Sequence, residues 1–202
     1  MRQISIDNSF AGWRAAARSL LAENVLPDNI VWSPASQGHL FAATITPVSP
    51  ASPAPVARVP ADFMRLAEAV ACFDDDARWS LLYRILFRLV NENHSLLEID
   101  SDPDVSIAKS MLKAVNRDVH KFHAFVRFRK IECDGEEIFG AWHEPHHFTV
   151  ERATPFFARR FGEMKFSIYT PKGCAHWDKK DLLFSPAAGK SSAPAPDEME
   201  DF

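Results

Sequence analysis

The stretch AFVRFRKIECDGEEIFGAWHEP, residues 124–145, contains a change of hydrophobic period. Before it, apolar residues recur at helical spacing, whereas AFVRFRKIE alternates apolar and polar residues in the way typical of a strand. Asp134–Gly135 then predicts a hairpin turn, and EIFGAWHEP predicts its return strand. The fold class predicted is therefore α+β: a helical N-terminal half followed by a small antiparallel sheet with one short helix.

Capping residues and apolar spacing locate the elements before this point. Ser9 can cap the first helix, Pro60 stands near the start of the second, and Ser101 or Asp102 with Pro103 opens the last. Helices are expected at 9–23, 60–73, 77–92 and 101–123, and short strands at 2–6 and 28–33. The segment ARWSLLYRILFRLVNE is apolar nearly all round, so we expect it to be the central helix.

Proline and glycine divide the rest of the chain. Thr154–Pro155 predicts the start of a short helix that Gly162 ends, and the residues from Lys165 to Pro186 predict two or three short strands. The expected organisation is a strand and helix segment at 1–42, a Pro-rich linker or loop at 43–60, a main α+β domain at 61–186 on which 1–42 packs, and a disordered acidic tail or linker at 187–202.

The composition is that of a folded protein of 202 residues with a core of ordinary size. No apolar run reaches the roughly 18 residues of a membrane span, and the N-terminus has no signal-peptide pattern. The three cysteines lie far apart, which fits a reducing cytoplasm and excludes a local zinc or iron–sulfur motif. The glycine-rich phosphate loops and the GxSxG elbow are also absent, so we expect no cofactor.

The net charge of −4 is unevenly distributed along the chain. Residues 1–104 carry −5, residues 105–180 carry +5, and residues 181–202 carry −4. Six of the eight histidines also lie in the basic middle segment. A basic, His-rich segment between acidic flanks favours an anionic partner such as a nucleic acid.

Four separated motifs in the second half carry a family resemblance. They are KAVNRDVHKFHAFVRFR (113–129), AWHEPHH (141–147), TPFFARRF (154–161) and FSIYTPKGCAHWD (166–178). In this order they resemble a domain-of-unknown-function family of bacterial DNA-metabolism or DNA-repair proteins. Members of that family stand beside a radical-SAM protein, or are fused N-terminally to a uracil-DNA glycosylase-like domain that binds uracil-DNA.

The resemblance covers roughly residues 4–186 and implies a DNA-repair context with DNA and either of those proteins as partners. It transfers no catalytic residue, because uracil recognition belongs to the glycosylase-like domain and not to any motif of this chain. The chain ends at DEMEDF, where a fused protein would enter that domain.

The stretch GAWHEPHHFTV, residues 140–150, concentrates groups that can bind metal or transfer protons. His143, Glu144, His146 and His147 are potential zinc ligands, but Pro145 excludes the helical HExxH geometry. A metal would need further ligands from elsewhere in the chain, so we predict no metal site. The candidate acid–base residues are His120, His143, Glu144, His176 and Asp178.

A nucleic-acid surface is the leading hypothesis for the basic segment. We expect phosphate contacts from Arg117, Lys121, Arg127, Arg129, Arg159 and Arg160. We expect Trp142, His143, His146 and Trp177 to line the groove, where exposed aromatic rings can stack on bases.

The leading hypothesis is thus a DNA-repair accessory domain that binds DNA, and two alternatives to it stay open. In the first, the same histidines catalyse a reaction on a nucleic-acid lesion. In the second, the chain is a protein–protein adaptor that uses the acidic helices at 60–104 and the Pro-rich segment.

Overall fold

The computed structural model describes residues 1–34, 58–133 and 136–192. It divides the chain into two compact units, Met1–Lys113 and Ala114–Phe202. Three sequence predictions lie wholly or mainly outside the described residues: the Pro-rich linker at 43–60, the turn at Asp134–Gly135 and the acidic tail at 187–202.

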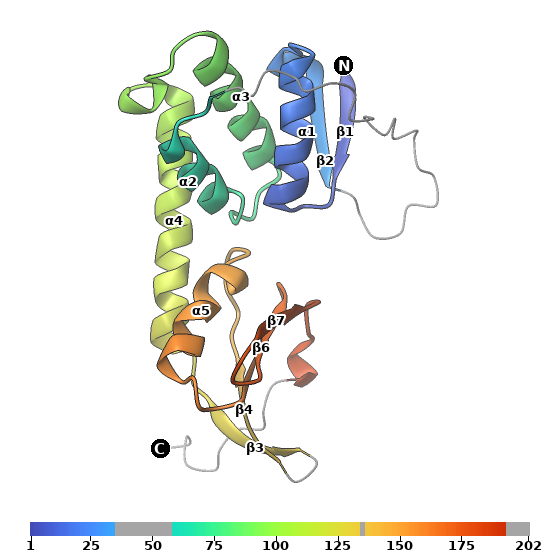
Figure 1. Ribbon diagram of the computed structural model, residues 1–202, viewed down its shortest axis with the longest axis vertical. Helices are drawn as coiled ribbons and strands as arrows, with labels where there is room; N and C mark the ends of the chain where they lie inside the picture. Colours follow the sequence, from blue (N-terminus) through green and yellow to red (C-terminus); the bar gives the residue numbers. More distant parts are fainter. Residues whose placement is uncertain (35–57, 134–135, 193–202) are drawn as a thin grey trace. The chain divides into compact units, whose positions relative to one another are not determined.

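Unit 1 is a helical layer joined to a two-stranded sheet (Figure 1). Its elements are β1 (Arg2–Ile6), α1 (Phe10–Ala22), η1 (Pro27–Asn29), β2 (Ile30–Pro34), α2 (Ala61–Val70), α3 (Ala77–Asn91), η2 (Leu96–Glu98) and the first half of α4 (Pro103–Phe125). β1 and β2 are parallel because α1 returns the chain to the same end of the sheet. All four predicted helices and both predicted strands are therefore present.

Helix α3 is central to unit 1, as its all-round apolar sequence predicts. Trp79, Tyr83 and Leu82 on this helix are fully buried. Trp13 of α1 stacks on Trp79 with ring centroids 6.3 Å apart, and its Nε1 donates to the Trp79 carbonyl oxygen at 3.2 Å. The polar atom of the buried indole is thus satisfied inside the apolar core.

The N-terminus of α4 carries the expected cap and an ion-pair network. Of the two residues predicted to cap this helix, Asp102 does so: its Oδ1 accepts from the backbone N–H groups of Asp104 and Val105. Arg88 of α3 reaches Asp102 at 2.5 Å and Asp104 at 3.1 Å, and Arg84 reaches Asp104 at 2.8 Å. Arg84 and Arg88, which are one helical turn apart on α3, therefore bind the start of α4.

Unit 2 contains the rest of α4 and a sheet whose strand order is β3-β4-β5-β6-β7. Its elements are β3 (Arg129–Cys133), β4 (Glu136–Trp142), α5 (Val150–Arg160), β5 (Phe166–Tyr169), β6 (Cys174–Trp177), β7 (Leu182–Ser185) and η3 (Lys190–Ser192). The predicted α+β class is confirmed, with helices mostly first and the sheet last. The sheet is mixed rather than antiparallel, because α5 crosses between β4 and β5 and makes that pair parallel.

Two predicted boundaries in unit 2 differ from the structure. Helix α4 continues to Phe125, so the strand begins only at Arg129. Helix α5 begins at Val150, so Pro155 lies inside it rather than at its start. Pro155 has no N–H to give to the Glu151 carbonyl. The Thr154 hydroxyl donates to a different carbonyl, that of Val150, at 2.8 Å.

Candidate nucleic-acid interface

The strand register gives the sheet of unit 2 two chemically different faces. On one face Phe139, Phe166, Trp177 and Leu182 lie opposite one another across four strands. These residues join a core with α5 and the end of α4, which includes Phe122 and Phe157. Seven of the 16 phenylalanines of the chain and Trp177 lie in this core.

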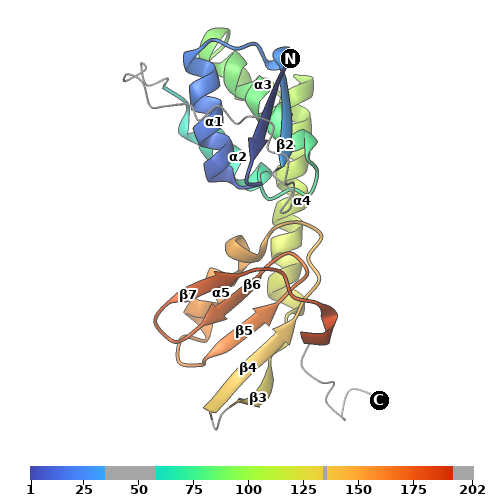
Figure 2. The same ribbon diagram turned by 90° about the vertical axis from the view of Figure 1, so that its right-hand side faces the viewer.

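The opposite face carries polar and aromatic side chains. Arg129 lies opposite Gly140, Gly140 opposite Ser167, and Ser167 opposite His176, so these four share the face across β3 to β6. Trp142 lies opposite Tyr169 on the same face. Figure 2 shows this face toward the viewer, with α5 behind the sheet and, among the described helices, only η3 at its end. We call it the open face.

His176 is locked in the middle of the open face by two serine hydroxyls. Its Nδ1 lies 2.9 Å from Ser167 Oγ and its Nε2 lies 2.8 Å from Ser185 Oγ. A neutral imidazole donates one of these hydrogen bonds and accepts the other, so both serines can be satisfied together. Burial lowers the pKa of His176 and favours this neutral form. Tyr169 packs edge-on against the locked ring with centroids 5.9 Å apart.

Trp142 is held at the end of β4 by the residue two positions on. Its Nε1 donates to Glu144 at 2.9 Å, and this hydrogen bond is the main reason that the pKa of Glu144 lies below its ordinary value. Lys190 of η3 lies 3.5 Å from the same carboxylate. The partly exposed indole and the exposed carboxylate thus form a pair, and the indole is the register partner of Tyr169.

The loop His143–Thr149 is anchored by a buried carboxylate. Asp118 of α4 is only 4% exposed. Its two oxygens accept from the backbone N–H groups of His146 at 3.0 Å and His147 at 3.1 Å, and from the Thr149 hydroxyl at 2.8 Å. The HEPHH motif therefore lies in the connection from β4 to α5, and the backbone of this connection is hydrogen-bonded to α4.

His143 is the member of this loop that points inward. Its ring lies 4.4 Å from that of Phe122, and its buried Nε2 has no hydrogen-bond partner among the described residues. Burial is the largest influence on the pKa of His143 and lowers it; the carboxylates of Asp118 and Glu144 oppose this effect, and His146 adds to it. The folded protein therefore holds His143 as the neutral imidazole.

These two histidines predict a specific dependence of stability on pH. Both have a lowered pKa in the folded state, so the unfolded chain binds more protons once the pH falls below about 6.5. The free energy of unfolding should therefore fall from pH 7.5 to 5.5 in urea titrations. His143→Gln and His176→Gln should each reduce this fall. An unaltered pH slope in the His143/His176 double variant would contradict the assignment.

The predicted site residues are distributed over several surfaces. Arg129 and Trp142 share the open face, while Trp177 lies on the core face, where its Nε1 donates to the Gly162 carbonyl at 3.0 Å. Trp142 and Trp177 therefore do not line one groove. Arg127 donates to the carbonyls of Ala124 and Val126. The remaining predicted phosphate contacts are exposed on helices: Arg117 and Lys121 on α4, Arg159 and Arg160 on α5.

The five acid–base candidates do not meet at one point. His120 is exposed on α4, His143 points into the core and His176 lies on the open face. Glu144 binds Trp142, and Asp178 accepts from the backbone N–H groups of Lys180 and Asp181 at 2.7 Å. Within the described residues, no group of three or more His, Cys, Asp or Glu side chains could hold a metal ion.

Asp118, Ser167 and Ser185 are site residues that the sequence reasoning missed. Asp118 had a sequence signal, because it lies at helical spacing from the apolar Val115 and Phe122 and so shares their buried stripe. The two serines had none, since each becomes important only through its cross-strand distance to His176.

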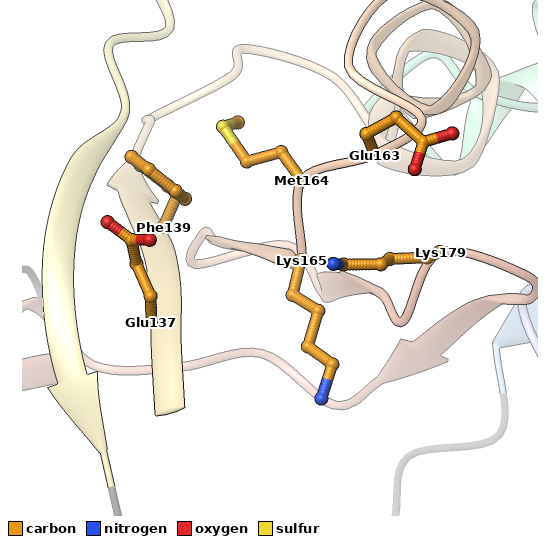
Figure 3. Close-up of a pocket in the computed structure, with 6 residues that line it drawn as sticks. All are labelled: Glu137, Phe139, Glu163, Met164, Lys165 and Lys179. Atoms are coloured by element: carbon orange, nitrogen blue, oxygen red, sulfur yellow. The ribbon is translucent and has the colours of Figure 1, made fainter. Parts of the chain in front are cut away.

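An open hollow of about 410 Å³ lies on the core side of β4 (Figure 3). Its lining is Glu137, Phe139, Glu163, Met164, Lys165 and Lys179. Figure 3 shows Lys165 extending away from Glu163, so the charges do not converge on one point. None of the residues predicted to bind DNA or to catalyse lines this hollow.

Residues 76–200 match the model of a protein family described as a domain of unknown function, DUF4130. The chain belongs to this family. The DUF4130 match includes α3, α4 and the whole described sheet of unit 2, whereas β1, α1 and β2 precede it. Searches among curated proteins and among solved structures found no match. None of the described helices has the length and apolar character needed to cross a membrane.

Proposed function

We propose that this chain is an accessory domain of DNA repair or DNA metabolism that binds DNA through the open face of unit 2. The observation that carries the proposal is the alignment of Arg129, Trp142 and Tyr169 on one sheet face that no long helix covers among the described residues. A guanidinium can contact phosphate, and partly exposed aromatic rings can contact bases.

The distribution of charge supports this choice of unit. Residues 114–192 of this unit have 13 Lys or Arg against 10 Asp or Glu, and the unit's other four acidic residues lie in the segment 193–202. One of the acidic residues, Asp118, turns its charge inward to backbone N–H groups. Exposed Arg117, Lys121, Arg159 and Arg160 add to the positive field around the unit, which favours approach of a polyanion.

The family resemblance of the four sequence motifs supports the biological setting. We propose a partner of the uracil-DNA glycosylase type or a radical-SAM protein, in the bacterial cytoplasm. The three widely spaced cysteines fit a reducing compartment. The domain would assist its partner by holding DNA, and the proposal assigns it no bond-making step.

Fluorescence anisotropy with labelled DNA at several salt concentrations tests the proposal. We expect affinity to fall steeply with salt, and Arg129→Ala to weaken binding several-fold and reduce the magnitude of the salt slope by about one. Arg14→Ala is the matched control, because Arg14 is an exposed arginine on α1 of unit 1. No binding at low salt, or equal losses in the two variants, would contradict the proposal. The adaptor hypothesis would then be tested by partner capture.

A further inference from the structure

We propose that the open face binds single-stranded DNA, with unpaired bases stacking on Trp142 and Tyr169; this inference rests on the proposed function and names its substrate class. The two residues are register partners at the ends of the neighbouring parallel strands β4 and β5. Side chains at such positions stand about 5 Å apart at their bases and point from the same face. Together they provide a two-ring platform.

Both rings lie outside the core of unit 2 and keep part of their surface accessible to a ligand. The core cluster of unit 2 includes Phe166 and Trp177 but neither Trp142 nor Tyr169. Each of the two platform rings is partly exposed. Two partly exposed aromatic rings on neighbouring strands offer a surface on which an unpaired base can stack.

Hydrogen bonds fix the platform before any ligand arrives. The Trp142 indole is held by Glu144, and Tyr169 packs edge-on against His176, which Ser167 and Ser185 hold in turn. Rings that are already ordered lose little side-chain entropy on binding. The serine–histidine–serine group thus supports the Tyr169 ring as well as joining β5, β6 and β7.

The geometry favours a single strand over a duplex. In a duplex the base faces are covered by their neighbours, so a ring on a flat sheet has no base face to contact. In a single strand the bases can turn onto the sheet while the phosphates follow the cations at its edges. Arg129 lies on the same face, on β3, opposite Gly140, which precedes Trp142 by two residues on β4. Lys190 lies 3.5 Å from Glu144, which follows Trp142 by two residues.

The test compares a labelled oligothymidylate with a DNA hairpin duplex, using the full chain. We expect the wild type to bind the single strand more tightly than the duplex. The double variant Trp142→Ala/Tyr169→Ala should weaken single-strand binding by about tenfold or more with a much smaller change for the duplex. Trp142→Phe/Tyr169→Phe should restore most of the affinity, because it keeps a ring at both positions. Phe125→Ala is the control, since Phe125 is 64% exposed on the end of α4 in the same unit.

The outcomes separate this inference from the proposed function. If Arg129→Ala weakens binding while the double alanine variant, folded by circular dichroism, binds the single strand like the wild type, the stacking inference is overturned and DNA binding stands. Preference for the duplex or for an RNA oligomer of the same length overturns the inference as well. If the wild type binds no DNA at low salt, both proposals fail.

Discussion

Asp118→Ala is expected to lower the free energy of unfolding by about 3–5 kcal/mol, because three buried or partly buried donors lose their acceptor at a cost of about 1–3 kcal/mol each. The substitution leaves the N–H groups of His146 and His147 and the Thr149 hydroxyl without their acceptor in a site where Asp118 is 4% exposed. The His143–Thr149 loop should then detach from α4. Urea denaturation measures the loss, and amide hydrogen exchange at His146 and His147 locates it.

Two variants make the Asp118 prediction specific. Asp118→Asn keeps one acceptor oxygen but places an NH₂ group against donors, so its loss of stability should be large as well. Glu151→Ala removes an exposed carboxylate from the first turn of the adjacent α5 and should change stability by no more than about 0.5–1 kcal/mol. A loss below about 1 kcal/mol in Asp118→Ala would contradict the role of Asp118 as the loop anchor, which rests on charge-assisted hydrogen bonds.

Arg88→Ala should have the second largest effect, a loss of about 2–4 kcal/mol at pH 7, because it leaves two partly buried carboxylates facing each other. Asp102 and Asp104 are only 10% and 17% exposed at their side chains, and Arg88 bonds both. Arg84 still pairs with Asp104, so Asp102 bears most of the loss. Arg65→Ala is the control: its ion pair with Asp62 is exposed and should contribute about 0.5 kcal/mol or less.

The Arg88 effect should disappear in acid. The hydrogen bond from Arg88 is the main cause of the lowered pKa of Asp102, which burial opposes. A carboxyl group with a lowered folded pKa stabilises the protein above its unfolded value, near 3.9, and this contribution is lost as the pH falls through the folded pKa. The difference in stability between wild type and Arg88→Ala should therefore be full at pH 6–7 and shrink below pH 4. A difference that is constant down to pH 2.5 would contradict the ion-pair explanation.

Local chemistry in the sequence determined most of the secondary structure. The Ser9 hydroxyl accepts from the Gly12 N–H at 3.0 Å, and Asp102 caps α4, because side-chain oxygens near a helix start need only residues two or three positions away. The apolar all-round pattern of 77–92 identified the buried central helix, alternation over 124–132 indicated the change to strands, and the Asp134–Gly135 turn signal identified the return strand that is β4. These patterns are periodic along the chain, so the α+β class could be predicted from the sequence alone.

The tertiary structure decided which strands are neighbours and therefore what the site contains. The parallel pairing of β4 with β5 depends on the α5 crossover, and α5 includes Pro155 that the sequence suggested as a start. Arg129, Trp142 and Tyr169 come from three strands, and only their register places them on one face. Asp118 reaches across about 30 residues to the HEPHH loop. Periodicity determines which side of its own element a residue occupies, whereas the partner it meets depends on hydrogen bonding and packing between segments distant in the chain.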